Sequence, residues 1–174
     1  MGLDTVEIIL AWETSFGVTL ENSEVSELRT PRQAIDLIAV KLGARESTAS
    51  ACLSMRAFHH LRDAISKTAD VSRSSIRPDS RVKDLLRDRR PQTWASIRAA
   101  SGISLLPEPG WFSPHTVAAL SHWAVRRAAR ELKPAGEPWT RGEIRCVVRE
   151  AIAEVAGSRQ FEDTDDFIYD LGFD

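Results

Sequence analysis

Residues 3–17 read Leu-Asp-Thr-Val-Glu-Ile-Ile-Leu-Ala-Trp-Glu-Thr-Ser-Phe-Gly. The apolar side chains in this stretch recur at spacings of three and four, which is typical of an amphipathic helix. Gly17 follows the last periodic residue, where many helices end in a left-handed residue. We therefore expect a helix from Leu3 to Phe16 and expect the rest of the fold to be organised around it.

This first helix has two different faces. The stripe that we predict to enter a core consists of Val6, Ile9, Trp12 and Phe16. A second stripe mixes apolar and acidic side chains and consists of Leu3, Glu7, Leu10 and Glu13. We interpret the second stripe as a surface for a protein partner. The alternative is that its leucines pack under another part of the chain while its carboxylates are solvated.

Charge divides the chain into three blocks. Residues 1–44 hold seven acidic and three basic side chains, and residues 137–174 hold ten and four, so both ends are acidic. Residues 45–136 hold eight acidic and sixteen basic side chains. Because such a shift indicates a change of domain, we predict one domain from residues 1–44 plus 137–174 and a basic helical bundle at 52–133.

Further helices are predicted from N-terminal capping signals and from apolar periodicity. Thr30-Pro31 with Gln33, and Thr140 with Glu143, are typical of capping boxes, and Ser113-Pro114 has a similar pattern. The predicted helices cover residues 31–42, 54–69, 91–100, 114–132 and 141–156. No stretch alternates between apolar and polar residues as a half-buried strand would. An all-α fold built from two small bundles is predicted, with residues 44–51 as a linker.

Composition and motifs limit the possible functions. No apolar run approaches the length of a membrane span, and acidic residues stand where a leader peptide would be basic and then apolar. The two cysteines, Cys52 and Cys146, are expected to be reduced thiols of a cytoplasmic protein. The four histidines show no zinc-protease spacing, and no nucleophile elbow or nucleotide-binding loop occurs. We therefore expect neither an enzyme nor a metal protein.

Residues at the two ends of the chain together resemble the acyl carrier protein family. That family has a hallmark Asp-Ser-Leu-Asp-Thr-Val-Glu, followed by a helix that ends in Phe-Gly-Ile or Phe-Gly-Val. Here Leu3 to Glu7 match the last five hallmark residues, and Phe16-Gly17-Val18 match the helix end. The helix at 31–42 resembles the family's last helix. The resemblance implies a four-helix carrier bundle.

The order of the matching pieces is changed. The C-terminal part resembles the family's beginning, with a first helix at 140–156, an acidic loop, and Asp-Leu-Gly-Phe-Asp at 170–174. In the family these pieces precede the hallmark, whereas here they come last. We therefore predict a circularly permuted acyl-carrier-like bundle with a second small bundle inserted. If it closes within one chain, Leu171 and Phe173 are expected to lie near Leu3 and Val6; otherwise the termini swap between two chains.

The resemblance also places the prosthetic-group position. In the family, the serine that follows the final Asp of the Asp-Leu-Gly-x-Asp segment carries the 4′-phosphopantetheine arm. Matching Asp174 and Leu3 to their family positions puts Gly2 at that serine, and glycine has no hydroxyl to form the phosphodiester. No cofactor is therefore expected. Asp174 is included in the interaction face, since it would lie at the start of the first helix, where negative charge is favourable.

The middle block is interpreted as a second, diverged carrier-like copy or as an unrelated helical bundle. Its helix, loop and Asp84-Leu85-Leu86 parallel the C-terminal pattern, but no serine stands in a matching context. Asp79-Ser80 is the nearest substitute, and it lacks the Leu-Asp that follows the family's serine. The helix after Ser113-Pro114 carries a basic patch of Arg126, Arg127 and Arg130.

Three hypotheses about function follow. The first is a carrier-like interaction or regulatory module without a prosthetic group, which acts beside an acyl-transfer or biosynthetic enzyme. The second is a working carrier with phosphopantetheine on an unexpected hydroxyl. The third is nucleic-acid binding through the basic middle block, in which the basic patch would neutralise phosphates. The acidic and basic blocks could also dock on each other within the chain, where charge would steer more than it stabilises.

Overall fold

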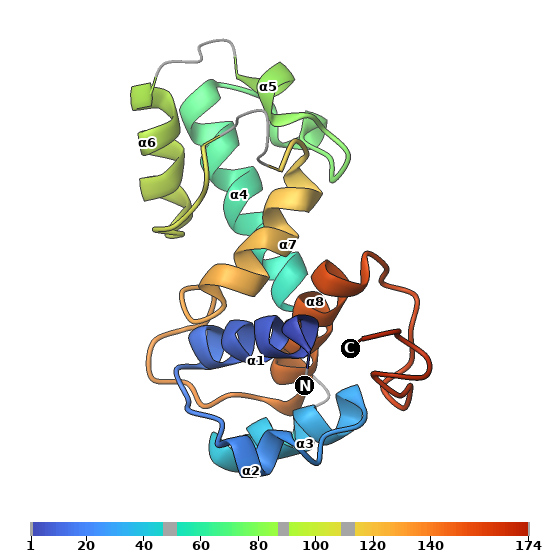
Figure 1. Ribbon diagram of the computed structural model, residues 1–174. Helices are drawn as coiled ribbons and strands as arrows, with labels where there is room; N and C mark the ends of the chain where they lie inside the picture. Colours follow the sequence, from blue (N-terminus) through green and yellow to red (C-terminus); the bar gives the residue numbers. More distant parts are fainter. Residues whose placement is uncertain (1, 47–51, 87–90, 109–113, 174) are drawn as a thin grey trace. The chain divides into compact units, whose positions relative to one another are not determined.

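The computed structural model describes residues 2–46, 52–86, 91–108 and 114–173 (Figure 1). Within these residues the secondary structure is helical. In chain order the helices are α1 (Leu3–Phe16), α2 (Asn22–Val25), α3 (Pro31–Lys41), α4 (Leu53–Ala69), the 3-10 helix η1 (Arg73–Ser75), α5 (Val82–Leu85), α6 (Pro91–Ser101), α7 (Val117–Ala128) and α8 (Arg141–Ala156). The described ranges contain two isolated β-bridges and no strand. The prediction of an all-α fold is confirmed.

The chain forms two compact units. Unit 1 combines Met1–Cys52 with Ala135–Asp174, and unit 2 is the continuous segment Leu53–Pro134. Unit 2 is therefore an insertion between two sequence-distant parts of unit 1. The net charge of the sequence changes sign near both divisions.

In unit 1, helix α8 packs against both α1 and α3 (Figure 1). Most of the buried residues of α8 are apolar, although Glu143 and Glu150 are buried with them. Each fully buried aliphatic side chain contributes roughly 1.5–3 kcal/mol. The buried apolar residues of these three helices are Ile8, Trp12, Phe16, Ala34, Ile35, Ile38, Ile144, Val147, Val148, Ala151, Ile152 and Ala153. The aromatic ring of Trp139, just before α8, meets that of Phe16 edge-on at 5.0 Å.

The helix ends of unit 1 follow the local signals in the sequence. The side chains of Thr30 and Thr140 each accept a hydrogen bond from the backbone N–H three residues on. The side chains of Gln33 and Glu143 in turn accept from the backbone N–H of the two threonines, which completes two capping boxes. Gly17 ends α1 in the left-handed region with φ of 68°, and its N–H donates to the carbonyl of Glu13. These predicted ends are confirmed.

Residues 44–46, predicted as linker, are tied into unit 1. The Arg45 N–H donates to the carbonyl of Trp139 at 2.9 Å, and the Arg45 carbonyl accepts from the Arg141 N–H at 3.1 Å. The start of α8 is thereby held beside the end of the α3 segment. The remainder of the predicted linker, 47–51, lies outside the described residues.

Unit 2 is built around α4, which packs against α6 and α7. The predicted inward residues Leu61 and Ile65 are buried, whereas Phe58 is only half-buried. The predicted burial of Trp94 and Ile97 in α6 is confirmed. The loop between α4 and α6 contains η1 and α5 and contributes Ile76 and Val82 to the core.

The predicted start of the last helix in unit 2 is wrong. Ser113 lies outside the described residues, and α7 begins at Val117 with Thr116 as its cap, three residues after Pro114. Thr116 is extended because its segment pairs with the loop before α5: the Val82 N–H donates to His115, and the Val117 N–H donates to Ser80. This tertiary pairing overrides the local Ser-Pro signal.

Candidate functional site

The predicted core stripe of α1 is partly wrong. Trp12 and Phe16 are buried, but Val6 is 41% exposed, and Ile8 is buried at 3%. The buried set of the helix is Ile8, Trp12, Ser15 and Phe16. Apolar residues occur on several sides of this helix, so periodicity alone does not choose between them. The choice is made by the elements that pack on α1, which are α8 and the C-terminal segment.

The other side of α1 is a row of exposed apolar side chains, which we call the α1 row. It consists of Leu3, Val6 and Leu10, with exposures of 85%, 41% and 56%. Spacings of three and four residues place the three side chains along one side of the helix. Glu7 is exposed beside them. Within unit 1, Leu3 and Leu10 are therefore not packed beneath another element.

Two other members of the predicted interaction face behave differently. Glu13 is half-buried, and its Oε1 accepts a hydrogen bond from the Leu20 N–H at 2.8 Å. It therefore holds the loop that follows α1. Asp174 lies outside the described residues.

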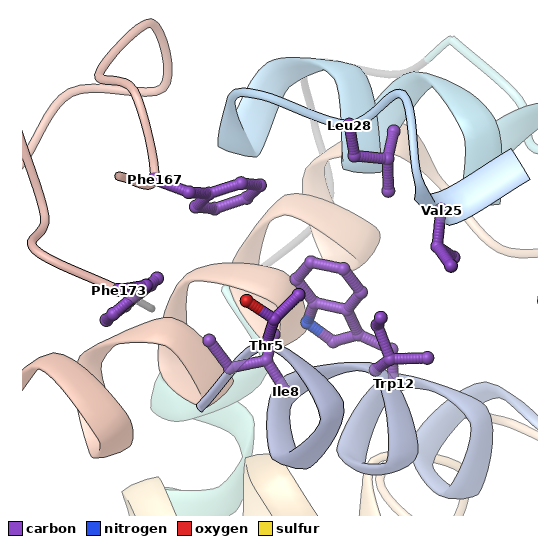
Figure 2. Close-up of a pocket in the computed structure, with 8 residues that line it drawn as sticks. Thr5, Ile8, Trp12, Val25, Leu28, Phe167 and Phe173 are labelled. Atoms are coloured by element: carbon purple, nitrogen blue, oxygen red, sulfur yellow. The ribbon is translucent and has the colours of Figure 1, made fainter. Parts of the chain in front are cut away.

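A small apolar pocket opens between α1 and the C-terminal segment (Figure 2). It encloses about 290 Å³ of empty volume counted out to its open mouth. Its lining residues are Thr5, Ile8, Ile9, Trp12, Val25, Leu28, Phe167 and Phe173. The Phe167 ring lies 6.0 Å from Phe173 and 6.5 Å from Trp12 between centroids. Because Phe173 and Thr5 share this pocket, the end of the chain packs on α1 of the same chain.

The pocket has a single indole donor at its base. Trp12 is 1% exposed, and its Nε1–H has no hydrogen-bond partner among the described residues. A buried donor without a partner is destabilising by about 1–3 kcal/mol. The burial of the large indole ring outweighs this cost.

The C-terminal segment is shaped by its own aspartates. The Asp166 carboxylate accepts from the N–H groups of Ile168 and Tyr169, and the Asp170 carboxylate accepts from the Asp166 N–H at 2.8 Å. Gly172 then takes φ of 73°, which turns the backbone so that the Phe173 N–H donates to Phe167 at 2.9 Å. The turn presents both phenylalanines to the pocket.

Asp163 anchors the acidic loop before this segment. Its carboxylate accepts hydrogen bonds from Arg145 and Arg149, the latter at 2.6 Å, and its carbonyl accepts from the Arg32 N–H at 2.8 Å. Burial of the Asp163 carboxyl opposes its ionisation, but the hydrogen bonds and charges of the two arginines outweigh burial and lower its pKa. The guanidinium of Arg149 also lies over the Phe161 ring at 4.1 Å. The loop is thus tied to both α8 and α3.

The start of α1 is a glycine. Gly2 is the N-cap, with an extended backbone and no side chain to bond the first free N–H groups. It has no hydroxyl, so it offers no point for a phosphodiester. In unit 2, the Ser80 hydroxyl accepts from the Arg77 N–H at 2.9 Å and is thus engaged by its own loop.

The predicted basic patch lies in unit 2 and is uneven. Arg127 and Arg130 are exposed, whereas Arg126 is half-buried. α7 ends at Ala128, two residues before Arg130, so the three side chains do not all lie on one helix as predicted. The helix stops short of the predicted Leu132 because turn hydrogen bonds follow: the Glu131 and Leu132 N–H groups donate to the carbonyls of Ala128 and Ala129.

The structure brings together two residues that sequence reasoning separated. Cys52 and Cys146 are 94 positions apart in the chain, and their sulfur atoms are 3.6 Å apart. Neither spacing nor a motif signals this pair. The described ranges contain no group of histidine, cysteine and acidic side chains arranged to hold a metal ion.

Across the described residues, each helix is too short or too polar to cross a membrane. Neither a protein-family model nor a solved structure matches the chain.

Proposed function

We propose that this chain is a carrier-like interaction module without a prosthetic group, which docks through the α1 row on an acyl-transfer enzyme. The observation that carries the proposal is the exposed row of Leu3, Val6 and Leu10 on a helix whose other side is buried. Under the proposal the protein is not an enzyme, and it acts in the cytoplasm.

The chemistry of the row defines the partner surface. Burying a leucine that is now exposed contributes roughly 1.5–3 kcal/mol, so the partner offers an apolar depression. Asp4 and Glu7 lie on the same helix, so basic residues are expected around that depression. Their attraction speeds encounter and sets orientation more than it adds affinity.

The carrier-like part of the proposal is supported by the resemblance together with the order of elements in unit 1. A capped helix, α8, is followed by an acidic loop whose last turn packs beside the start of α1. α1 leads into the short α2 and the capped α3. If the C-terminal part is placed before the N-terminal part, the helices follow one another in the same order as in the acyl carrier family that the sequence resembles. Gly2 at the start of α1 removes the carrier function from that arrangement.

The first experiment tests the absence of the prosthetic group. The wild-type protein and Gly2→Ser are each incubated with coenzyme A and a broad-specificity phosphopantetheinyl transferase, with an ordinary acyl carrier protein as the positive control. Intact mass spectrometry is expected to show no change for the wild type and one added phosphopantetheine group for Gly2→Ser, mapped to residue 2. An adduct on the wild type would establish the working-carrier alternative instead. An unmodified Gly2→Ser protein would remove the support for the family equivalence.

The second experiment tests the α1 row. The wild type, Leu3→Arg, Leu10→Arg and the matched control Val40→Arg are compared for binding to purified acyl-transfer enzymes by biolayer interferometry. Val40 is 81% exposed and lies on α3, which does not carry the row, so its substitution introduces the same charge at another apolar surface position. The two row variants are expected to weaken binding by about tenfold or more, equal to 1.4 kcal/mol, while Val40→Arg binds as the wild type does.

The result also separates the remaining hypotheses. Equal affinity for all four proteins would show that the row is not the docking surface. The nucleic-acid alternative would be favoured by a different result: the wild type binds a DNA duplex more weakly as salt is raised, and the double variant Arg127→Ala/Arg130→Ala does not bind the duplex.

A further inference from the structure

The only two cysteines of the chain meet in the folded protein. Cys52 directly precedes α4 and is exposed, and Cys146 lies on α8 and is partly exposed. Their Sγ atoms are 3.6 Å apart and are not joined by a disulfide bond. The two residues come from opposite sides of the inserted unit 2 in the sequence, so only the fold brings them together.

We propose that Cys52 and Cys146 form an oxidation-responsive pair that closes to an intramolecular disulfide. A disulfide requires sulfur atoms about 2.05 Å apart. The present separation exceeds this by about 1.5 Å, a gap that a small side-chain rotation spans at an exposed position such as Cys52. A pair of thiols in contact is also placed for rapid capture of an oxidised intermediate.

Hydrogen peroxide is the oxidant for which the arrangement is suited. The Cys52 thiol is the more exposed, so its sulfur attacks the peroxide, the O–O bond breaks, and Cys52 becomes a sulfenic acid with release of one water. The sulfur of Cys146 then attacks the sulfenic sulfur, and the hydroxyl leaves as a second water. In sum, two thiols and one peroxide give one disulfide and two waters. Each sulfur loses one electron, and the peroxide gains two.

The bond has a defined structural effect. It joins the residue immediately before the first helix of unit 2 to α8 of unit 1, and it closes a covalent loop that contains all of unit 2. Closing a loop of this length restricts the unfolded chain strongly. Oxidation is therefore expected to raise the thermal midpoint by about 5 °C or more, and reduction with dithiothreitol is expected to reverse the rise.

The experiment compares the full-length wild type with Cys52→Ser and Cys146→Ser after treatment with a slight excess of hydrogen peroxide. The wild type is expected to form no disulfide-linked dimer and to lose about 2 Da, and peptide mapping without reductant should find residues 52 and 146 linked. Cys146→Ser should trap the sulfenic acid at Cys52 as a dimedone adduct, because its resolving thiol is absent. Cys52→Ser should react more slowly and should not show the rise in thermal midpoint.

Other results of the same measurements would overturn the inference. A wild-type protein that gains oxygen at one cysteine without linking the two, or that forms mainly disulfide-linked dimers, would show that the pair does not close within the chain. Because Cys52 is exposed, Cys52→Ser is expected to fold with the same helix content by circular dichroism. If peroxide raised the thermal midpoint of Cys52→Ser as much as that of the wild type, the effect would come from another residue.

Discussion

At the scale of the residue, Asp163 is an acidic side chain that the sequence suggests is solvated but that the fold uses to hold a loop in place. It belongs to an acidic loop in the sequence, yet its side chain is 17% exposed and is bonded by two arginines of α8. These partners are 18 and 14 positions away, so no local pattern pairs them. The pKa of Asp163 is lowered because the arginines outweigh the effect of burial.

Replacing Asp163 by Asn is expected to destabilise the protein by about 1–3 kcal/mol at pH 7, since charge-assisted hydrogen bonds to both arginines are lost. A carboxyl whose folded-state pKa is lowered stabilises the fold at pH values above its ordinary pKa of 3.8, and this stabilisation is lost as the pH falls through the folded-state value. The difference in unfolding free energy between wild type and D163N should therefore shrink below about pH 4. Urea unfolding at several pH values measures it.

A matched control is Asp63→Asn in unit 2. Asp63 pairs with Arg73, but both side chains are about half exposed, and exposed pairs of this kind contribute less than about 1 kcal/mol. An equal loss of stability for D63N and D163N would contradict a special role for Asp163.

At the scale of the element, α1 shows what helical periodicity decides and what it leaves open. Its end before Gly17 is predicted from a local signal and is confirmed, because a left-handed cap depends on adjacent residues. Its buried side is not fully predicted, since Val6, Ile8 and Leu10 are all apolar and only packing partners distinguish them. The same holds for the helix predicted after Pro114, whose first residues pair with a distant loop instead.

The two sides of α1 can be compared by alanine substitution. Ile8→Ala removes a side chain that is 3% exposed and is expected to destabilise unit 1 by about 2–5 kcal/mol, because it leaves a cavity beside Trp12. Val6→Ala, at a side chain 41% exposed, should cost less than about 1 kcal/mol. Chemical denaturation followed by Trp fluorescence gives both values. If V6A were the more damaging of the two, the stripe expected from sequence would be the true core.

At the scale of the whole molecule, the three charge blocks of the sequence predict two domains, and the structure divides the chain into two units at nearby positions. Charge is informative here because it is summed over many residues and does not depend on any single contact. The contact between Cys52 and Cys146 could not be predicted in this way, because it depends on two side chains whose meeting requires the finished fold of unit 1. The same is true of the pocket between α1 and Phe173.

The two units are expected to respond separately to core substitutions. Leu61→Ala in α4 and Ile144→Ala in α8 each truncate a fully buried side chain, with an expected cost of about 2–5 kcal/mol. L61A should accelerate hydrogen exchange of amides in α4, α6 and α7, while I144A should accelerate exchange in α1, α3 and α8. Mass spectrometry of exchanged peptides distinguishes the two patterns. Loss of protection throughout the chain in either variant would show that the units unfold together.

The insertion of unit 2 into unit 1 also sets an order of events on the ribosome. α1 and α3 are synthesised early, but α8, against which both pack, follows α3 by about 100 residues, or about 5–20 s at usual rates of translation. Unit 2 is complete during that interval and can fold first, because it is continuous in sequence. During that interval the apolar sides of α1 and α3 are not yet covered by α8. A nascent chain of this protein is therefore expected to depend on chaperones most strongly just before α8 emerges.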